Sequence, residues 1–264
     1  MAKLFLHDHP VSSYAQKVRI ALREKGIPFD YKTPDGLGSG SYIADLHKAN
    51  PRHEVPALVD GDFTVWDSSV ILGYLEDKFP EHPLLPADPK GRASAKMIEE
   101  ICDTQYEAIN WGYGEVVWQS RATGDLQEKM VAEIKRQTSV MYSWLESELG
   151  SNDYFNGSTF GYADVCVAPM MNRGVIIDLG PAKGTPLQKW HERIQQHESV
   201  RSVFEEVAEG AKKMAKTGDF FQKGGRAREY RDHRLEWMIK SGGLEVVLNG
   251  LKNQNIRFCR APGE

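Results

Sequence analysis

The sequence predicts an α/β unit followed by an all-helical unit, with an extended helical tail at the end of the chain. Strand and helix patterns alternate through residues 1–80 in the order βαβαββα. Residues 81–91 are rich in proline, so no regular element is expected to run through them. From residue 92 onward, apolar residues recur at helical spacing almost everywhere.

The first unit opens with a short β-prone run over residues 3–7. A helix is expected over residues 14–25, where apolar residues recur at helical spacing and a glycine follows. Residues 29–33 are predicted to form a second strand. A short helix follows and closes at Asn50-Pro51, because the residue before a proline is biased away from the helical conformation.

A hairpin and a third helix complete this unit. Residues 56–60 and 63–66 are β-prone and flank a Gly-Asp turn. A helix begins at Ser68 and ends before Pro80. Its buried face is predicted from four apolar residues: Val70, Ile71, Tyr74 and Leu75. The element order therefore predicts a small mixed sheet with helices packed on it.

Residues 92–223 are predicted to form the helical domain. Five helices are expected, over residues 92–121, 126–149, 163–178, 187–196 and 200–216. Residues 224–264 form a tail in which an apolar stripe recurs at helical spacing: Leu244, Val247, Leu248 and Leu251. We expect this tail to pack on the protein's own body, with partner binding as the alternative.

Composition excludes several classes of function. The chain has 264 residues, 41% of them hydrophobic, and a net charge of −4, which gives no basic surface for a nucleic-acid backbone. The first residues lack the pattern of a signal peptide, and no apolar run is long enough to span a membrane. We therefore expect a cytoplasmic protein without nucleic-acid or membrane partners.

Cysteine and histidine patterns predict neither disulfides nor a metal. The three cysteines are far apart and match no zinc-binding spacing. His7-Asp8-His9 would place two histidines on one face of a strand, but no third ligand is evident in the sequence.

Two stretches carry a resemblance to a known family. They are "SSYAQKVRIALREKG", from residue 12, and "NPRHEVPALVDGDFTVWDSSVILGYLEDKFP", residues 50–80. Together with the proline-rich linker and the helical remainder, they resemble the glutathione S-transferase superfamily over residues 3 to about 216. The resemblance implies a thioredoxin-like domain, a helical domain, a homodimer and a transferase that uses glutathione in detoxification.

The resemblance also implies how glutathione is held. Pro56 matches the family's cis-proline, beside which the Val55 backbone pairs with the cysteinyl unit. Asp67 and Ser68 match the pair that binds the γ-glutamyl end at a helix start. Taken alone, Pro56 could be a trans proline opening an edge strand, and Ser68 an ordinary helix cap.

The glycyl end of glutathione has a less clear partner. Many relatives carry Lys or Gln directly before the Val-Pro pair, whereas this chain has Glu54, which would repel the glycyl carboxylate if it pointed inward. The contact is assigned to His53 or Arg52, with His47 or Lys48 as substitutes.

Ser12 matches the catalytic serine of the theta, zeta and tau-like classes, or of etherase-like relatives. A hydroxyl that donates to the glutathione sulfur would favour its thiolate. Ser13 and Tyr14 are the alternatives, and a simple helix cap is the non-catalytic interpretation. No cysteine occupies the position of Ser12, which argues against glutaredoxin-like thiol transfer.

The second substrate is expected to be a hydrophobic, aromatic electrophile. Its predicted pocket comprises Pro10, Val11, Tyr106, Trp111 and Tyr113, although aromatic residues on helices are more often part of the core. Conjugation is the expected reaction, and β-aryl ether cleavage, dehalogenation and isomerisation begin with the same thiolate. A non-catalytic binding module is the hypothesis of a different class.

Overall fold

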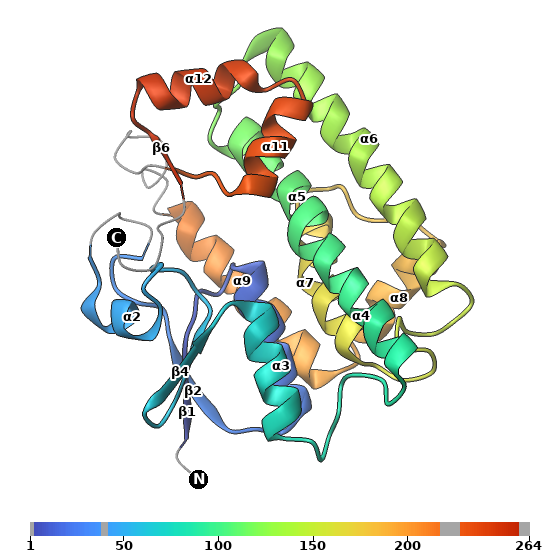
Figure 1. The fold of residues 1–264 in the computed structure, drawn as a ribbon. Helices are drawn as coiled ribbons and strands as arrows, with labels where there is room; N and C mark the ends of the chain where they lie inside the picture. The colour runs from blue at the N-terminus through green and yellow to red at the C-terminus, as the bar shows by residue number, and fades with distance from the viewer. Residues whose placement is uncertain (1–2, 38–41, 217–227, 259–264) are drawn as a thin grey trace.

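A four-stranded mixed sheet forms the first part of the molecule (Figure 1). The strand order is β2-β1-β3-β4, with β1 parallel to β2 and antiparallel to β3. The strands are β1 (Leu4–His7), β2 (Phe29–Lys32), β3 (Ala57–Asp60) and β4 (Phe63–Trp66). The predicted α/β unit is therefore confirmed. The structure is a computed structural model and describes residues 3–37, 42–216 and 228–258.

Three helices accompany this sheet. They are α1 (Ser13–Glu24), α2 (Ala44–Ala49) and α3 (Ser68–Lys78). Helix α1 packs against α3, and α2 contacts β3 and β4. Residues 38–41, in the glycine-rich stretch before α2, lie outside the described residues.

The buried face of α3 differs from the prediction. Ile71 and Leu75 are buried as expected, but Leu72 is buried as well. Val70 was predicted on this face and is instead 56% exposed. The core-facing stripe is centred between Ile71 and Leu72, which turns Val70 toward solvent.

The helical part begins earlier than predicted, inside the stretch 81–91. Helix α4 starts at Pro89 because Asp88 caps it: the Asp88 carboxylate accepts from the Gly91 N–H at 2.9 Å. A proline suits the first helical turn because its missing N–H would have no partner there. One helical path then continues through α4 (Pro89–Ile101), the π-helical turn η1 (Cys102–Tyr106), α5 (Glu107–Tyr113) and a second π-helical turn, η2 (Gly114–Trp118).

Four further helices complete the helical part. They are α6 (Gly124–Leu149), α7 (Tyr162–Ile176), α8 (Pro186–Ile194) and α9 (Glu198–Lys216). Helix α7 is almost fully buried and packs on α1, α4 and α8. Its start is held by Asp164, whose carboxylate accepts from the Gly161 N–H at 3.0 Å. Among the described residues, no helix is long and apolar enough to cross a bilayer.

Helix α1 joins the sheet to the helical part through two fully buried cations. The Lys17 ammonium lies 2.5 Å from the Asp103 carboxylate and 3.3 Å from that of Glu99. The Arg19 guanidinium pairs with Glu206 of α9. Because an unpaired buried charge is costly, these partners fix how the two parts pack.

The tail folds back over the helical part, as expected. It comprises β5 (Arg228–Glu229), α11 (Asp232–Lys240), α12 (Leu244–Lys252) and β6 (Ile256–Arg257). Helix α11 packs on α5, where Gly112 lies so close to the Trp237 ring that any side chain there would clash. The predicted boundary between helical domain and tail, at residues 223 and 224, falls outside the described residues.

The buried face of α12 was predicted wrongly. Of the predicted stripe, Val247 is buried, but Leu248 is 56% exposed and Leu244 and Leu251 are about half exposed. Gly250 packs directly on Ile256, and this close approach sets the helix rotation. The leucine side therefore faces outward.

Candidate active site

A cavity of about 880 Å³ lies where the sheet, the helical part and the tail meet. Carboxylates outnumber lysine and arginine side chains in its wall. The first part contributes Tyr14, Asn50, Arg52, Glu54, Val55, Pro56, Asp67, Ser68 and Ser69. The helical part contributes Lys96, Glu99, Glu100, Asp103 and Thr104. The tail contributes Tyr230, Arg231, Asp232, His233, Leu235 and Phe258.

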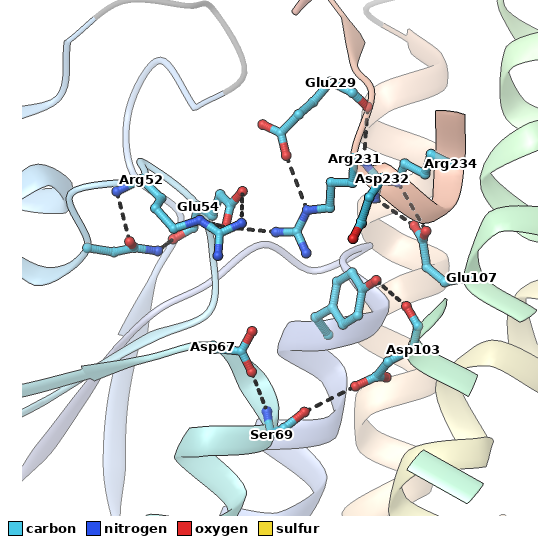
Figure 2. Close-up of polar contacts among 12 residues, drawn as sticks. Arg52, Glu54, Asp67, Ser69, Asp103, Glu107, Glu229, Arg231, Asp232 and Arg234 are labelled. Carbon is cyan, nitrogen blue, oxygen red and sulfur yellow. Dashed lines mark hydrogen bonds and ion pairs between the residues drawn. The ribbon is translucent and has the colours of Figure 1, made fainter. Parts of the chain in front are cut away.

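The start of α3 forms one end of the cavity. Asp67 has a left-handed backbone, with φ of 72°, and its carboxylate accepts from the Ser69 N–H at 3.0 Å. The Ser69 hydroxyl donates to the Asp103 carboxylate at 3.3 Å (Figure 2). Ser68 is buried at the cavity wall. A helix N-terminus favours an anion, and Asp67 favours a cation, so this end suits a zwitterionic amino-acid group.

The loop before β3 forms a second part of the wall. The Val55–Pro56 peptide bond is cis, and both residues line the cavity. Asn50 holds the loop, because its amide donates to the Glu54 carbonyl at 2.9 Å and accepts from the Arg52 N–H at 2.9 Å. The loop therefore presents a fixed surface to the cavity.

Ser12 begins α1. Its hydroxyl oxygen accepts from the Ala15 N–H at 3.3 Å, so Ser12 is the N-cap. A serine that caps a helix through its oxygen retains its own proton for donation elsewhere. Ser12 is half-buried, Ser13 is buried in the first turn, and neither belongs to the described cavity wall. Capping and proton donation are thus compatible in Ser12.

Tyr14 lines the cavity with its ring, but its hydroxyl is engaged. The hydroxyl donates to the Asp103 carbonyl at 2.7 Å. Burial, with the nearby carboxylates of Glu107 and Asp103, raises the pKa of Tyr14 well above its usual value. The Arg231 guanidinium lies 5.5 Å from the ring centre. Tyr14 is therefore a wall residue whose proton is held by the backbone.

Asp103 is the central carboxylate of the cavity and was not singled out from the sequence. Burial raises its pKa to about 6, although the Lys17 ammonium at 2.5 Å opposes that shift. Burial acts to lower the pKa of Lys17, but Asp103, Cys166 and Glu99 together outweigh burial and the pKa is raised. Lys17 therefore stays charged while Asp103 titrates close to neutral pH.

The residues predicted at the glycyl end divide into two groups. Arg52 lines the cavity and pairs with Glu54, with 3.2 Å between nitrogen and oxygen. His53 instead turns toward His47, and their ring nitrogens lie 2.9 Å apart. Neither histidine belongs to the described cavity wall, and Lys48 is exposed. Arg52 is thus the predicted residue that the structure brings to the site.

The tail supplies residues that the sequence reasoning missed. Glu107 of α5 accepts from Arg234 at 2.6 Å and from His233 at 3.1 Å, which docks α11 beside the cavity. Arg231 then reaches across to Glu54, with 2.7 Å between nitrogen and oxygen (Figure 2). The arginine-rich stretch "RAREYRDHR", which begins at Arg226, was the available signal for an ion-pairing segment.

The predicted electrophile pocket does not coincide with this cavity. Tyr106 and Trp111 are buried in the core, and the Trp111 ring packs edge-on against Tyr230. Tyr113 packs against Trp118, and Pro10 and Val11 lie against Gly210 of α9. None of the five predicted residues belongs to the described cavity wall, because their own packing contacts occupy them.

Within the described ranges, no three His, Cys, Asp or Glu side chains gather as a metal site would require. Asp8, the middle residue of the His-Asp-His sequence, lies 3.3 Å from the Arg19 guanidinium instead.

The four-stranded mixed sheet with its helices, followed by the helical part, defines a thioredoxin-like domain joined to a helical domain. Residues 6–83 match the model of the glutathione S-transferase N-terminal domain, and residues 109–198 match that of the C-terminal domain. A glutathione S-transferase of Triticum aestivum is 34% identical over 66% of this chain and 79% of its own. The chain belongs to the glutathione S-transferase family.

Solved structures agree with this assignment. A tau-class glutathione S-transferase from mango, Mangifera indica, aligns with a TM-score of 0.69 and 21% identity, over 81% of this chain and 98% of its own. Rice GST1 in complex with glutathione aligns with a TM-score of 0.64 and 27% identity, over 83% of this chain and 100% of its own. The predicted fold class and the predicted enzyme, a glutathione S-transferase, are confirmed.

Proposed function

We propose that this enzyme binds glutathione in the cavity and that Ser12 stabilises the glutathione thiolate. The observation that carries the proposal is the convergence of Val55-Pro56 and Asp67-Ser68, which are separated in sequence, on one cavity wall. The family relatives are named for glutathione, and rice GST1 was solved with it.

The wall offers a partner for each part of the γ-glutamyl and cysteinyl units. The Asp67 carboxylate faces the ammonium, while the Ser68 hydroxyl and the α3 N–H groups take the carboxylate. The Val55 backbone pairs with the cysteinyl unit in the manner of an added strand. This arrangement directs the thiol toward the start of α1.

Ser12 then sets the protonation state of the thiol. A free thiol has a pKa of about 8.5, so only a small fraction is thiolate at neutral pH. A hydroxyl that donates to the sulfur stabilises the anion, and the proton leaves to solvent. The thiolate attacks an electrophilic carbon, the carbon–sulfur bond forms, and the leaving group departs with the electron pair of the broken bond.

The electrophile is proposed to be flat and apolar. The tail places Tyr230, Leu235 and Phe258 in the wall, and these replace the aromatic residues expected from α5 and its neighbours. Conjugation, β-aryl ether cleavage, dehalogenation and isomerisation all use the same thiolate. A panel of aromatic halides and β-aryl ethers would distinguish these reactions by their products.

The test compares wild type with Ser12→Ala, with Ser13→Ala as the matched control. Glutathione affinity is measured by calorimetry, the pKa of the bound thiol by ultraviolet absorbance of the thiolate, and turnover with an aromatic halide. Ser12→Ala is expected to raise the thiol pKa and lower turnover about 10- to 100-fold, with little change in affinity. Unchanged turnover in Ser12→Ala, with a large loss in Ser13→Ala or Tyr14→Phe, would assign the activating hydroxyl elsewhere.

A further inference from the structure

Arg231 is a tail residue that lines the cavity and pairs with Glu54 of the first domain. Its guanidinium lies 2.7 Å from the Glu54 carboxylate and over the Tyr14 ring (Figure 2). Arg231 also pairs with Glu229 at 3.3 Å, and Glu229 pairs with Arg257 at 3.1 Å. The β5–β6 pairing holds this part of the tail in register.

The contact with Arg231 affects the charge of the cavity, because Glu54 is a cavity-wall carboxylate. Its side chain belongs to the cavity wall and is only 14% exposed. Burial raises the pKa of Glu54, and Arg231 is the strongest influence that opposes this shift, ahead of Arg52. Arg231 of the tail is thus the group that most favours the anionic form of Glu54.

The position of Glu54 follows from the direction of the bound peptide. In the proposed function, the γ-glutamyl end lies at Asp67 and Ser68 and the cysteinyl unit pairs with Val55. An extended peptide of three residues spans roughly 10 Å, so its glycyl end continues past Val55 to the side of Glu54 and Arg52. Figure 2 shows Asp67 and Ser69 on one side of the space and Arg52, Glu54 and Arg231 on the other.

A carboxylate cannot bind beside Glu54 unless the local charge is reversed. Arg52, Arg231 and Arg257 face the carboxylates of Glu54 and Glu229 in one network of ion pairs, which leaves these five groups with one net positive charge. Without Arg231 the net charge at this place would be zero. The Glu54 carboxylate would then repel an incoming anion more strongly.

We propose that the tail is part of the glutathione site and that Arg231 is its determinant for the glycyl carboxylate. Arg231 neutralises Glu54 and, together with Arg52, presents guanidinium N–H groups to the anion. A planar guanidinium suits this role because it binds carboxylates through two parallel hydrogen bonds. The proposal rests on the proposed function, since it assumes that glutathione occupies this cavity.

The test uses two peptides and calorimetric affinities. One is glutathione, and the other is its glycyl monoethyl ester, which lacks the carboxylate charge. Arg231→Gln is expected to weaken glutathione binding about 10- to 100-fold and ester binding less than about 3-fold. Adding Glu54→Gln to Arg231→Gln should recover most of the lost affinity for glutathione, and Arg231→Lys should fall between wild type and Arg231→Gln.

Arg257→Gln is the matched control, because it removes a tail arginine that pairs with Glu229 outside the cavity wall. It should bind both peptides as wild type does. Near-ultraviolet circular dichroism of the tryptophans checks that the tail stays docked in each variant. Equal weakening of peptide and ester by Arg231→Gln, or no weakening of either, would overturn the proposal while leaving the proposed function intact. A wild-type protein that binds neither peptide would overturn both.

Discussion

At the scale of single residues, Asp103 connects the two parts of the enzyme at the cavity. Its carboxylate meets Lys17 and Ser69, and its carbonyl accepts from Tyr14. One residue of the helical part therefore fixes three residues of the first domain. A substitution of Asp103 should affect the packing of the domains as well as the cavity.

Asp103 should also make stability depend on pH. Its folded pKa of about 6 lies above the usual value of an aspartate, so the folded state binds a proton more tightly than the unfolded state. The free energy of unfolding should therefore fall as pH rises from about 4 to about 6, by up to ~3 kcal/mol from this group. Denaturant unfolding of wild type and Asp103→Asn at several pH values measures this contribution. Parallel pH profiles for the two proteins would contradict it.

Local sequence signals pointed to cavity-wall residues that belong to one loop and one helix start. Val55-Pro56 and Asp67-Ser68 were predicted because a loop before a strand and the first turn of a helix define them. Tyr106 was predicted in the electrophile pocket and is buried in the core, because helical spacing does not say whether a ring faces a cavity or the core. Its hydroxyl in fact lies against that of Tyr142, inside the helical part.

At the scale of elements, the docking of α11 depends on one buried acid. Glu107 accepts from Arg234 and His233, and these interactions hold its pKa well below its usual range even though burial opposes them. The Trp237 indole adds a hydrogen bond of 2.7 Å to Gln137. Helix α11 is thus attached by charge at its start and by an aromatic ring near its end.

Glu107→Gln should loosen this attachment. The variant leaves the buried Arg234 cation without its anion, a change that typically costs about 3–5 kcal/mol. Faster hydrogen exchange in residues 228–258 is expected, with slow exchange retained in α7. Glu148→Gln, an exposed acid on α6, is the matched control. Exchange in the tail that is equal in both variants would show that Glu107 does not anchor α11.

The rotation of α12 shows why element faces are hard to predict. Leu244, Leu248 and Leu251 satisfy helical spacing, yet they face outward. The partner surface decides which side is buried, and here a glycine allows β6 to approach closely. Such a contact forms between segments that the periodicity of one helix does not describe.

At the scale of the whole molecule, the homodimer that the family resemblance implies has a candidate surface. Phe63 of β4, Val70 of α3 and Met97 of α4 are 51%, 56% and 59% exposed. Figure 1 shows α3 between the sheet and α4, so these residues lie on neighbouring elements. Exposed apolar side chains on adjoining elements are typical of surfaces that become buried on association.

The double variant Val70→Glu/Met97→Glu should therefore be monomeric, because it would place charges inside the interface. Light scattering coupled to size-exclusion chromatography measures the mass directly. Leu248→Glu is the matched control, since Leu248 is also 56% exposed but lies on α12. If Leu248→Glu dissociates the dimer and the double variant does not, the tail carries the interface instead.

The order of the two domains could be predicted because the strand–helix alternation and the helical spacing are each regular along the chain. Strand and helix patterns alternate before the proline-rich stretch, and helical spacing dominates after it. The start of α4 was predicted too late in the chain because a proline usually ends a helix. Pro89 nevertheless fits the first turn of α4, beside the Asp88 cap. The full set of cavity residues could not be predicted from the sequence, because Asp103 and Arg231 reach the cavity through packing between distant segments.

The buried cations of α1 carry a consequence for protein engineering. Lys17 and Arg19 lie in the first domain, whereas Glu99, Asp103 and Glu206 lie in the helical part. A chimera that fuses residues 1–80 to the second half of another transferase must supply acids at those three positions. Where the donor lacks them, Lys17 would be left without an anion at the domain boundary and Arg19 would keep only Asp8, so the hybrid should be recovered as aggregate from recombinant expression.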